Sequence, residues 1–144
     1  MFVVIEDMGV RYTGDAKGTP ISYGLGPTCA AIAFPASLVE IGEEALAGLA
    51  LTQVIIPGAV RTIGPSAFAG TFSLTAVEMG EGVQAIDARA FGHCLSLTQV
   101  TLPASVQWMD EIAFDGSENV QIHAPAGSYA ESFANAQGLP FVAQ

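Results

Sequence analysis

The chain has 144 residues, of which 51% are hydrophobic and only 12% are charged. It is therefore long enough for one domain with a sizeable core and too apolar to remain disordered. Fourteen acidic residues against four basic ones give a formal net charge of −10. A chain this acidic repels phosphates, which argues against nucleic acids and anionic membrane surfaces as partners.

The mean hydropathy of +0.47 could suggest a membrane protein, and residues 18–39 indeed carry no charge. The same residues contain several glycines and prolines, which exclude a membrane-spanning helix. At the N-terminus no basic segment precedes an apolar run and a small-residue cleavage site, so no secretory leader is visible. We therefore expect either an intracellular protein or a leader outside this sequence.

Residues 1–28 differ in pattern from the rest of the chain. Residues 2–5 and 10–13 are apolar segments that flank a turn, which predicts a β-hairpin. Residues 14–28 are rich in Gly, Pro and Thr, which predicts a loop. We expect the hairpin to be an N-terminal cap, because the first of the repeats that follow has nothing upstream on which to stack.

Residues 29–126 repeat one apolar pattern with a period of about 23 residues. The clearest copy begins with Leu51-Thr-Gln-Val-Ile-Ile-Pro57. Copies start near residues 29, 51, 74 and 97, and a partial copy starts near residue 119. Units of this length bury their apolar face only by stacking on their neighbours. The sequence therefore predicts a single domain, 1–144, built as a β-rich solenoid.

Each repeat contains three apolar groups, which predict three parts of a coil. Leu51, Val54 and Ile56 have the spacing of a short strand with one buried face, and a proline ends it. Val60 and Ile63 predict a shorter contact on the opposite wall. The next column holds helix N-caps and predicts a helical turn; its members are Gly42, Gly64, Asp87 and Asp110. That turn should place a ladder of side chains in the core: Leu46, Phe68, Phe91 and Phe114.

Residues 127–144 predict a cap of a different kind. Ser128 and Glu131 have the spacing of a capping box, and the residues that follow form one apolar stripe. Gly138 is a typical C-terminal stop, and Pro140 lies just beyond it. We expect an amphipathic helix that closes the solenoid, followed by a short strand around Phe141–Val142.

The repeated phrase Leu-Thr-x-Val-x-Ile/Leu-Pro-x-x-Val-x-x-Ile-x-x-x-Ala-Phe resembles that of the bacterial BspA-like leucine-rich repeat family. Residues 126–141 resemble that family's usual C-terminal end, so the resemblance covers 29–144. It implies a leucine-rich repeat solenoid with one strand and one helical turn per repeat, no catalytic residues, and a role in adhesion at the cell surface or after secretion. Three positions depart from the pattern: Gly80 replaces the proline, Leu46 replaces the phenylalanine, and only Cys94 keeps the family's frequent cysteine.

Three patterns could suggest chemistry but have simpler explanations. Residues 80–85 fit the dinucleotide pattern G-x-G-x-x-A, but the flanking repeats place ordinary solenoid residues in the same columns. Cys29 and Cys94 lie three repeats apart, which is roughly 14 Å at ~4.8 Å per strand and too far for a disulfide. His93 and His123 lie in different columns and cannot share a metal ion. We expect free thiols and no cofactor.

An acidic cluster remains as an alternative site. Asp87 and Asp110 stack in adjacent repeats, with Glu111 and Asp115 nearby. A metal-binding or enzymatic protein could use these carboxylates, but no loop supplies the six to eight oxygens that Ca²⁺ prefers. N-capping and solvated charge explain them more simply. We therefore expect no enzyme and no metal site.

The outward residues of the stacked strands form the candidate binding surface, called here the strand face. Its candidate contacts are Gln53, Ile55, Glu78, Gln99, Thr101, Gln121 and His123. We predict a monomeric, non-catalytic module that binds a protein or glycan across this face. The alternative is that the face is an ordinary outer surface that binds no partner. Trp108 is either a packed edge residue or an exposed contact.

Overall fold

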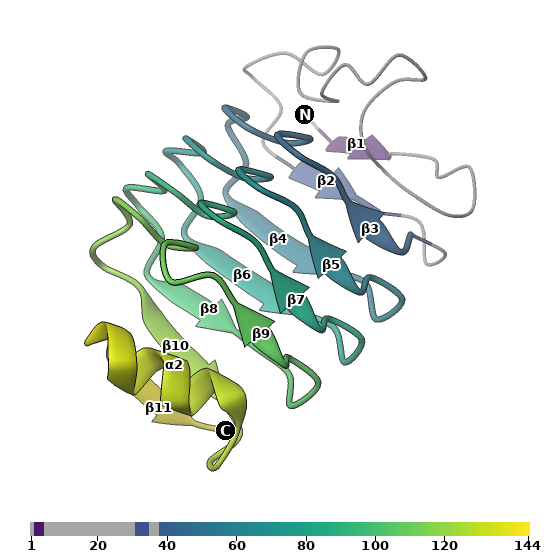
Figure 1. Ribbon diagram of the computed structural model, residues 1–144. Helices are drawn as coiled ribbons and strands as arrows, with labels where there is room; N and C mark the ends of the chain where they lie inside the picture. The colour runs from purple at the N-terminus through teal and green to yellow at the C-terminus, as the bar shows by residue number, and fades with distance from the viewer. Residues whose placement is uncertain (1, 5–30, 35–37) are drawn as a thin grey trace.

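Figure 1 shows the computed structural model, which describes residues 2–4, 31–34 and 38–144. The chain winds into coils that stack along one axis, and every strand pair is parallel. Parallel pairing follows from the repeat, because each coil places its equivalent strand, running in the same direction, beside the strand of the coil before it. The predicted β-rich solenoid is thus confirmed. In the described part of the chain, no helix is long and apolar enough to cross a membrane.

One strand from each of four successive coils, together with β11 from the C-terminal cap, forms a five-stranded sheet, called here the strand wall. Its order is β11-β10-β8-β6-β4. Val54 and Ile56 are buried while Gln53 and Ile55 are exposed, as a strand with one apolar face requires. The strands are β4 (Gln53–Ile56), β6 (Ala76–Met79), β8 (Gln99–Thr101), β10 (Gln121–Ala124) and β11 (Phe141–Ala143).

The N-terminal strand β1 (Phe2–Val4) pairs in parallel with β2 (Ala31–Ala33). The other arm of the expected hairpin, the loop at 14–28 and Cys29 lie outside the described residues.

The opposite side of each coil contributes a two-residue strand, and these strands form the short-strand wall. They are β3 (Glu40–Ile41), β5 (Thr62–Ile63), β7 (Ala85–Ile86) and β9 (Trp108–Met109), in the order β3-β5-β7-β9. The second residue of each strand is buried. The predicted shorter apolar contact opposite the main strands is confirmed.

The expected helical turn is wrong: residues 64–70 instead form two successive turns. Ala67 N donates to Gly64 O at 3.2 Å, and Ser66 has a positive φ of 55°. Phe68 N donates to Ala90 O of the next coil at 2.7 Å. A helix would direct that N–H along its own segment. Stacking gives it a partner in the neighbouring coil, so equivalent turns form a third wall, the turn wall, at 42–48, 64–70, 87–93 and 110–116.

The phenylalanine ladder is present in the core. Phe68 and Phe91 stack with ring centroids 5.1 Å apart, and Phe91 and Phe114 stack at 5.6 Å. Phe133 from the C-terminal helix follows at 6.3 Å with its ring tilted by 56°. The ladder therefore continues from the repeats into the cap, and all four rings are buried.

Helix α2 (Tyr129–Gln137) covers the last coil, in agreement with the predicted capping helix. The Ser128 hydroxyl accepts from Glu131 N at 3.4 Å, and Gly138 ends the helix with a φ of 70°. After the helix, β11 pairs in parallel with β10, so the strand predicted beyond Pro140 is also present.

Candidate functional site

The structure places all seven predicted contact residues on one surface. The strand register aligns one row along the solenoid axis, Gln53, Ala76, Gln99 and Gln121, and a second row, Ile55, Glu78, Thr101 and His123. The first residue of each row is exposed, and the rows become half-buried toward β10. Ile55 stands out because 69% of its surface is exposed. A partner that covered this side chain would remove apolar surface from water, which favours binding.

At the C-terminal end of the strand face, three polar side chains form a hydrogen-bonded cluster, and one of them was not among the predicted contact residues. His123 Nε2 lies 2.9 Å from Gln121 Oε1, and Gln144 Nε2 lies 3.2 Å from His123 Nδ1. Val142, which is 36% exposed, continues the second row because β11 pairs with β10. Gln144 and Val142 were not among the predicted contact residues, because β11 belongs to no repeat. The apolar segment after Pro140 was the only signal for it.

A small pocket of about 190 Å³ lies where β6 and β8 end. Its lining includes the carboxylates of Glu78 and Glu81, the hydroxyl of Thr101 and the amide of Gln144. None of the lining residues in the described part of the chain is basic. These acceptors favour a ligand group that donates hydrogen bonds or carries positive charge.

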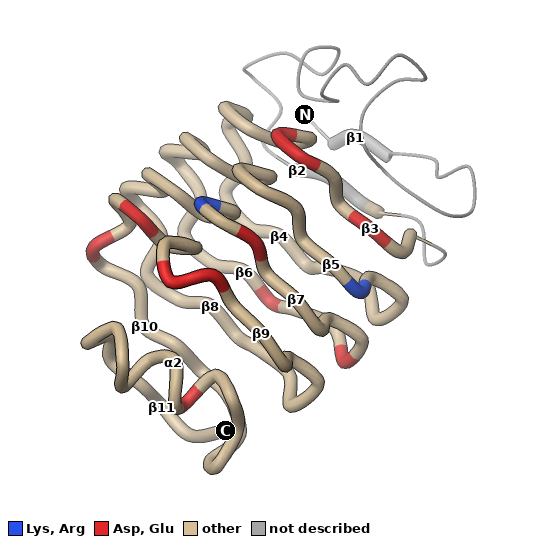
Figure 2. Tube along the Cα trace, viewed as in Figure 1, with Lys and Arg blue, Asp and Glu red and all other residues tan. Residues whose placement is uncertain are grey.

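Two carboxylates of the acidic cluster, those of Asp110 and Asp115, make local contacts. Asp110 Oδ1 accepts from Ile112 N at 3.0 Å, which is a turn-capping bond. Asp115 forms an ion pair with Arg89 at 3.3 Å, with both side chains about half exposed. Figure 2 shows acidic segments on several successive coils and few basic ones. Within the described residues, no three His, Cys, Asp or Glu side chains gather as a metal site would require.

The two glycines of the dinucleotide-like pattern serve coil packing. A Cβ at Gly80 would lie 2.5 Å from Gly58 N, and one at Gly82 would overlap the Arg61 side chain. Gly80 N donates to Ile56 O at 2.8 Å, a bond that a proline would lack. The structure thus explains why glycine replaces the repeat's usual proline at this position.

Cys94 belongs to a buried polar column that the sequence analysis missed. Thr71 Oγ1 lies 3.1 Å from Cys94 Sγ, and Cys94 N donates to Ser117 Oγ at 2.8 Å. Both hydroxyls are buried, and Cys94 is a free thiol. Burial raises the pKa of this thiol, and hydrogen bonds with Thr71 and Ser117 partly oppose the rise. The spacing of 23 residues between these three positions was the available signal.

Several apolar side chains are exposed away from the strand face. Trp108 is 45% exposed in β9, the last strand of the short-strand wall, so it is an exposed residue rather than a packed one. Phe72 and Leu95 are also exposed and lie 23 residues apart, in one column of the repeat. His93 is exposed on the turn wall.

The comparisons with known proteins agree with this architecture. A family model described as the BspA type leucine rich repeat region, in six copies, matches residues 27–126. The solenoid is thus of the leucine-rich repeat class. The chain belongs to the BspA-type leucine-rich repeat family. A search of curated protein sequences gave no significant match.

Solved bacterial structures are similar over part of their length. A leucine-rich repeat protein from Bacteroides capillosus is 34% identical with a TM-score of 0.54, covering 60% of this chain and 64% of that one. The T. pallidum leucine-rich repeat protein TpLRR is 27% identical with a TM-score of 0.53, covering 69% and 60%. The pneumococcal vaccine antigen PcpA shares the fold, with 23% identity, a TM-score of 0.64 and coverage of 69% and 26%. The chain therefore spans less than two thirds of each of these proteins.

Proposed function

We propose that this chain is a non-catalytic interaction module that binds a protein or a glycan across the strand face. The observation that carries the proposal is the alignment of the seven contact residues in two rows, beginning at the exposed Ile55. Membership in a leucine-rich repeat family supports it, because solenoids usually bind partners on such stacked surfaces.

The two rows give the partner a chemical character. Ile55 supplies an apolar anchor at one end, and Glu78 with Thr101 supplies acceptors beside the small pocket in the middle. His123 and its two glutamine neighbours supply donors and acceptors at the other end. A partner with one apolar group and several hydroxyl or basic groups fits this order.

The proposal is tested by a charge-matched pair of variants. Ile55→Glu/Thr101→Glu adds two negative charges to the strand face. Gln84→Glu/Gln107→Glu adds the same two charges at exposed positions outside that face. Both variants and the parent are immobilised and probed with extracellular-matrix proteins, bacterial-envelope extracts and a glycan array, after melting curves show that all three fold.

The parent and the Gln84/Gln107 variant should capture the same partner. The strand-face variant should bind that partner with an affinity at least about tenfold lower, equivalent to ~1.4 kcal/mol. If all three proteins capture it equally, the partner does not bind the strand face.

We also propose that the module acts at the bacterial cell surface. The family resemblance motivates this placement, since it implies surface adhesion. Labelling intact cells with a membrane-impermeant reagent tests it, with a cytoplasmic protein as the control. Labelling of this chain without the control is the expected result, and labelling only after lysis would contradict the placement.

A further inference from the structure

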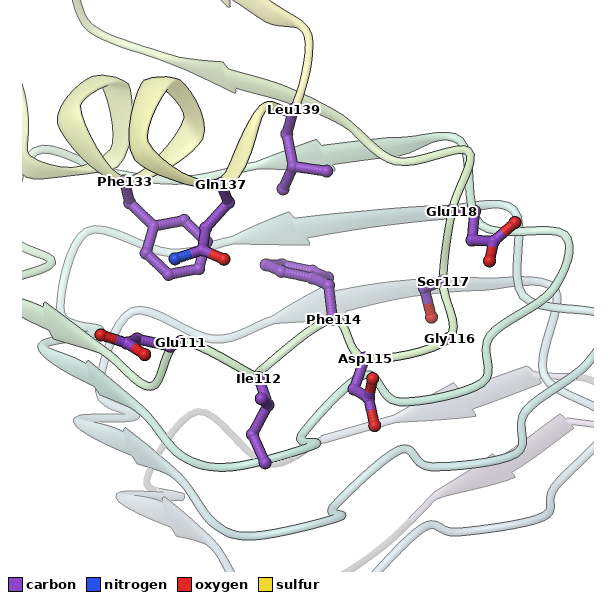
Figure 3. Close-up of a pocket in the computed structure, with 10 residues that line it drawn as sticks. All are labelled: Glu111, Ile112, Phe114, Asp115, Gly116, Ser117, Glu118, Phe133, Gln137 and Leu139. Atoms are coloured by element: carbon purple, nitrogen blue, oxygen red, sulfur yellow. The ribbon is translucent and has the colours of Figure 1, made fainter.

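A pocket of about 310 Å³ lies at the C-terminal end of the solenoid, between the last coil of the turn wall and helix α2. Phe114 and Gly116 come from the turn wall, and Phe133 and Gln137 come from α2. In Figure 3 the rings of Phe114 and Phe133 form its apolar part. The pocket is separate from the strand face, none of whose seven residues lines it.

The cap closes the other two walls but leaves the turn wall open. On the strand wall, β11 pairs with β10 and continues the sheet. On the short-strand wall, Met109 N donates to the Tyr129 hydroxyl at 3.1 Å. On the turn wall, the Phe133 ring covers Phe114, but it supplies no backbone to the coil.

The open edge carries two N–H groups that are paired in the preceding coil. There, Phe91 N donates to Ala113 O at 2.9 Å and His93 N donates to Asp115 O at 2.8 Å. The equivalent donors, Phe114 N and Gly116 N, have no hydrogen-bond acceptor in the part of the chain that the structure describes. As at the edge of a sheet, unpaired donors are a template for one more segment of backbone.

The charge around the pocket is negative. Glu111 and Glu118 both line it and are exposed, and neither makes an ion pair or hydrogen bond within the described residues. Asp115, also at the pocket, already pairs with Arg89. Among the residues that the structure describes, no basic side chain lines the pocket. The surroundings therefore favour a positively charged occupant.

We propose that this pocket binds a basic peptide that follows the course of a coil and adds one more layer to the turn wall. Two peptide carbonyls, two residues apart, accept hydrogen bonds from Phe114 N and Gly116 N, as the next coil does for Phe91 and His93. Lysine or arginine side chains lie near Glu111 and Glu118. A short apolar side chain between the carbonyls faces the rings, since Phe133 already covers part of Phe114. This site goes beyond the strand-face function and does not depend on it.

The first test uses the blocked peptide acetyl-Lys-Ala-Lys-Ala-Lys-amide and backbone amide NMR of the whole chain. The Phe114 and Gly116 amides should shift on titration and exchange more slowly with solvent, while the paired Phe91 amide should not change. The acidic peptide acetyl-Glu-Ala-Glu-Ala-Glu-amide should leave both amides unchanged. Spermidine, which has positive charge but no carbonyl, should not slow their exchange.

The second test compares two charge-matched variants at low salt. Glu111→Gln/Glu118→Gln removes both unpaired carboxylates of this pocket, and we expect about three- to tenfold weaker binding of the basic peptide. Glu43→Gln/Glu44→Gln removes the same charge at exposed positions in the first turn of the turn wall, away from both pockets, and should change the affinity less than twofold.

Three results would overturn the proposal. They are unchanged Phe114 and Gly116 amides at millimolar basic peptide, equal protection by spermidine, or a larger loss of affinity in the Glu43/Glu44 variant. None of them bears on whether a partner binds the strand face.

Discussion

The ring of Phe91 is fully buried between those of Phe68 and Phe114, with centroids 5.1 and 5.6 Å away. Phe91→Ala removes both stacking contacts and leaves a cavity that the rigid coils cannot fill. We expect the free energy of unfolding to fall by ~3–5 kcal/mol. This is a large share of the ~5–15 kcal/mol typical of a domain.

Denaturant unfolding measures this loss, and Phe72→Ala is the control because Phe72 is 59% exposed. The control should change stability by much less. A Phe91→Ala protein that melts within a couple of degrees of the parent would contradict the buried ladder.

The Cys94 thiol predicts a pH effect on stability. Burial raises its pKa in the folded state, so the folded protein keeps the thiol proton at a pH where the unfolded chain loses it. The stability that this provides is present below pH 9.0, the ordinary value, and is lost as pH rises beyond it. In a Cys29→Ser background, unfolding free energies from pH 7 to 10.5 should fall, and Cys29→Ser/Cys94→Ala should show a smaller decrease. Equal slopes would show that Cys94 is not responsible.

At the scale of elements, the C-terminal helix and strand cover exposed core and edge. Deleting residues 127–144 would uncover Phe114 and leave β10 as an unpaired edge. We expect the parent to sediment as a monomer and the truncated chain to associate or aggregate. Analytical ultracentrifugation of both proteins measures this. A truncated chain that stays monomeric with an unchanged melting temperature would mean that the cap contributes nothing to the solenoid.

The turn wall shows how an element can depend on its neighbours. Asp87 and Asp110 are good helix N-caps, and the residues after them could form a helical turn when considered alone. In the stack, Phe91 N instead donates to Ala113 O of the next coil. Both arrangements satisfy the Phe91 donor, and in the stack its acceptor comes from the adjacent coil.

At the scale of the whole molecule, the acidic cluster tests the alternative of a metal-dependent protein. We expect millimolar CaCl₂ to leave the melting temperature unchanged relative to NaCl of equal ionic strength. A bound ion at 100 times its dissociation constant would add ~2.7 kcal/mol, which is readily measured. A calcium-specific rise in melting temperature that Asp87→Ala abolishes would make the metal-dependent alternative the better account.

The strand face also belongs to this scale, because it exists only when the coils are in register. The alternation of Gln53, Val54 and Ile55 predicts which side chains point outward. The pairing of Ile55 with Glu78, and of Glu78 with Thr101, converts these positions into rows. The outward position of these side chains could therefore be predicted from the sequence, whereas Val142 and Gln144 lie beside them only because β11 pairs with β10.

The sequence by itself determined the period, the parallel stack, the phenylalanine ladder and the capping helix. These features follow from which positions are apolar and how they are spaced, and that information is local to each repeat. The tertiary structure alone decided the turn wall, the buried Thr71–Cys94–Ser117 column and the open edge at Phe114 and Gly116. Each of these depends on which backbone group lies one coil away, and a hydrogen-bond donor takes its partner from space rather than from its own segment.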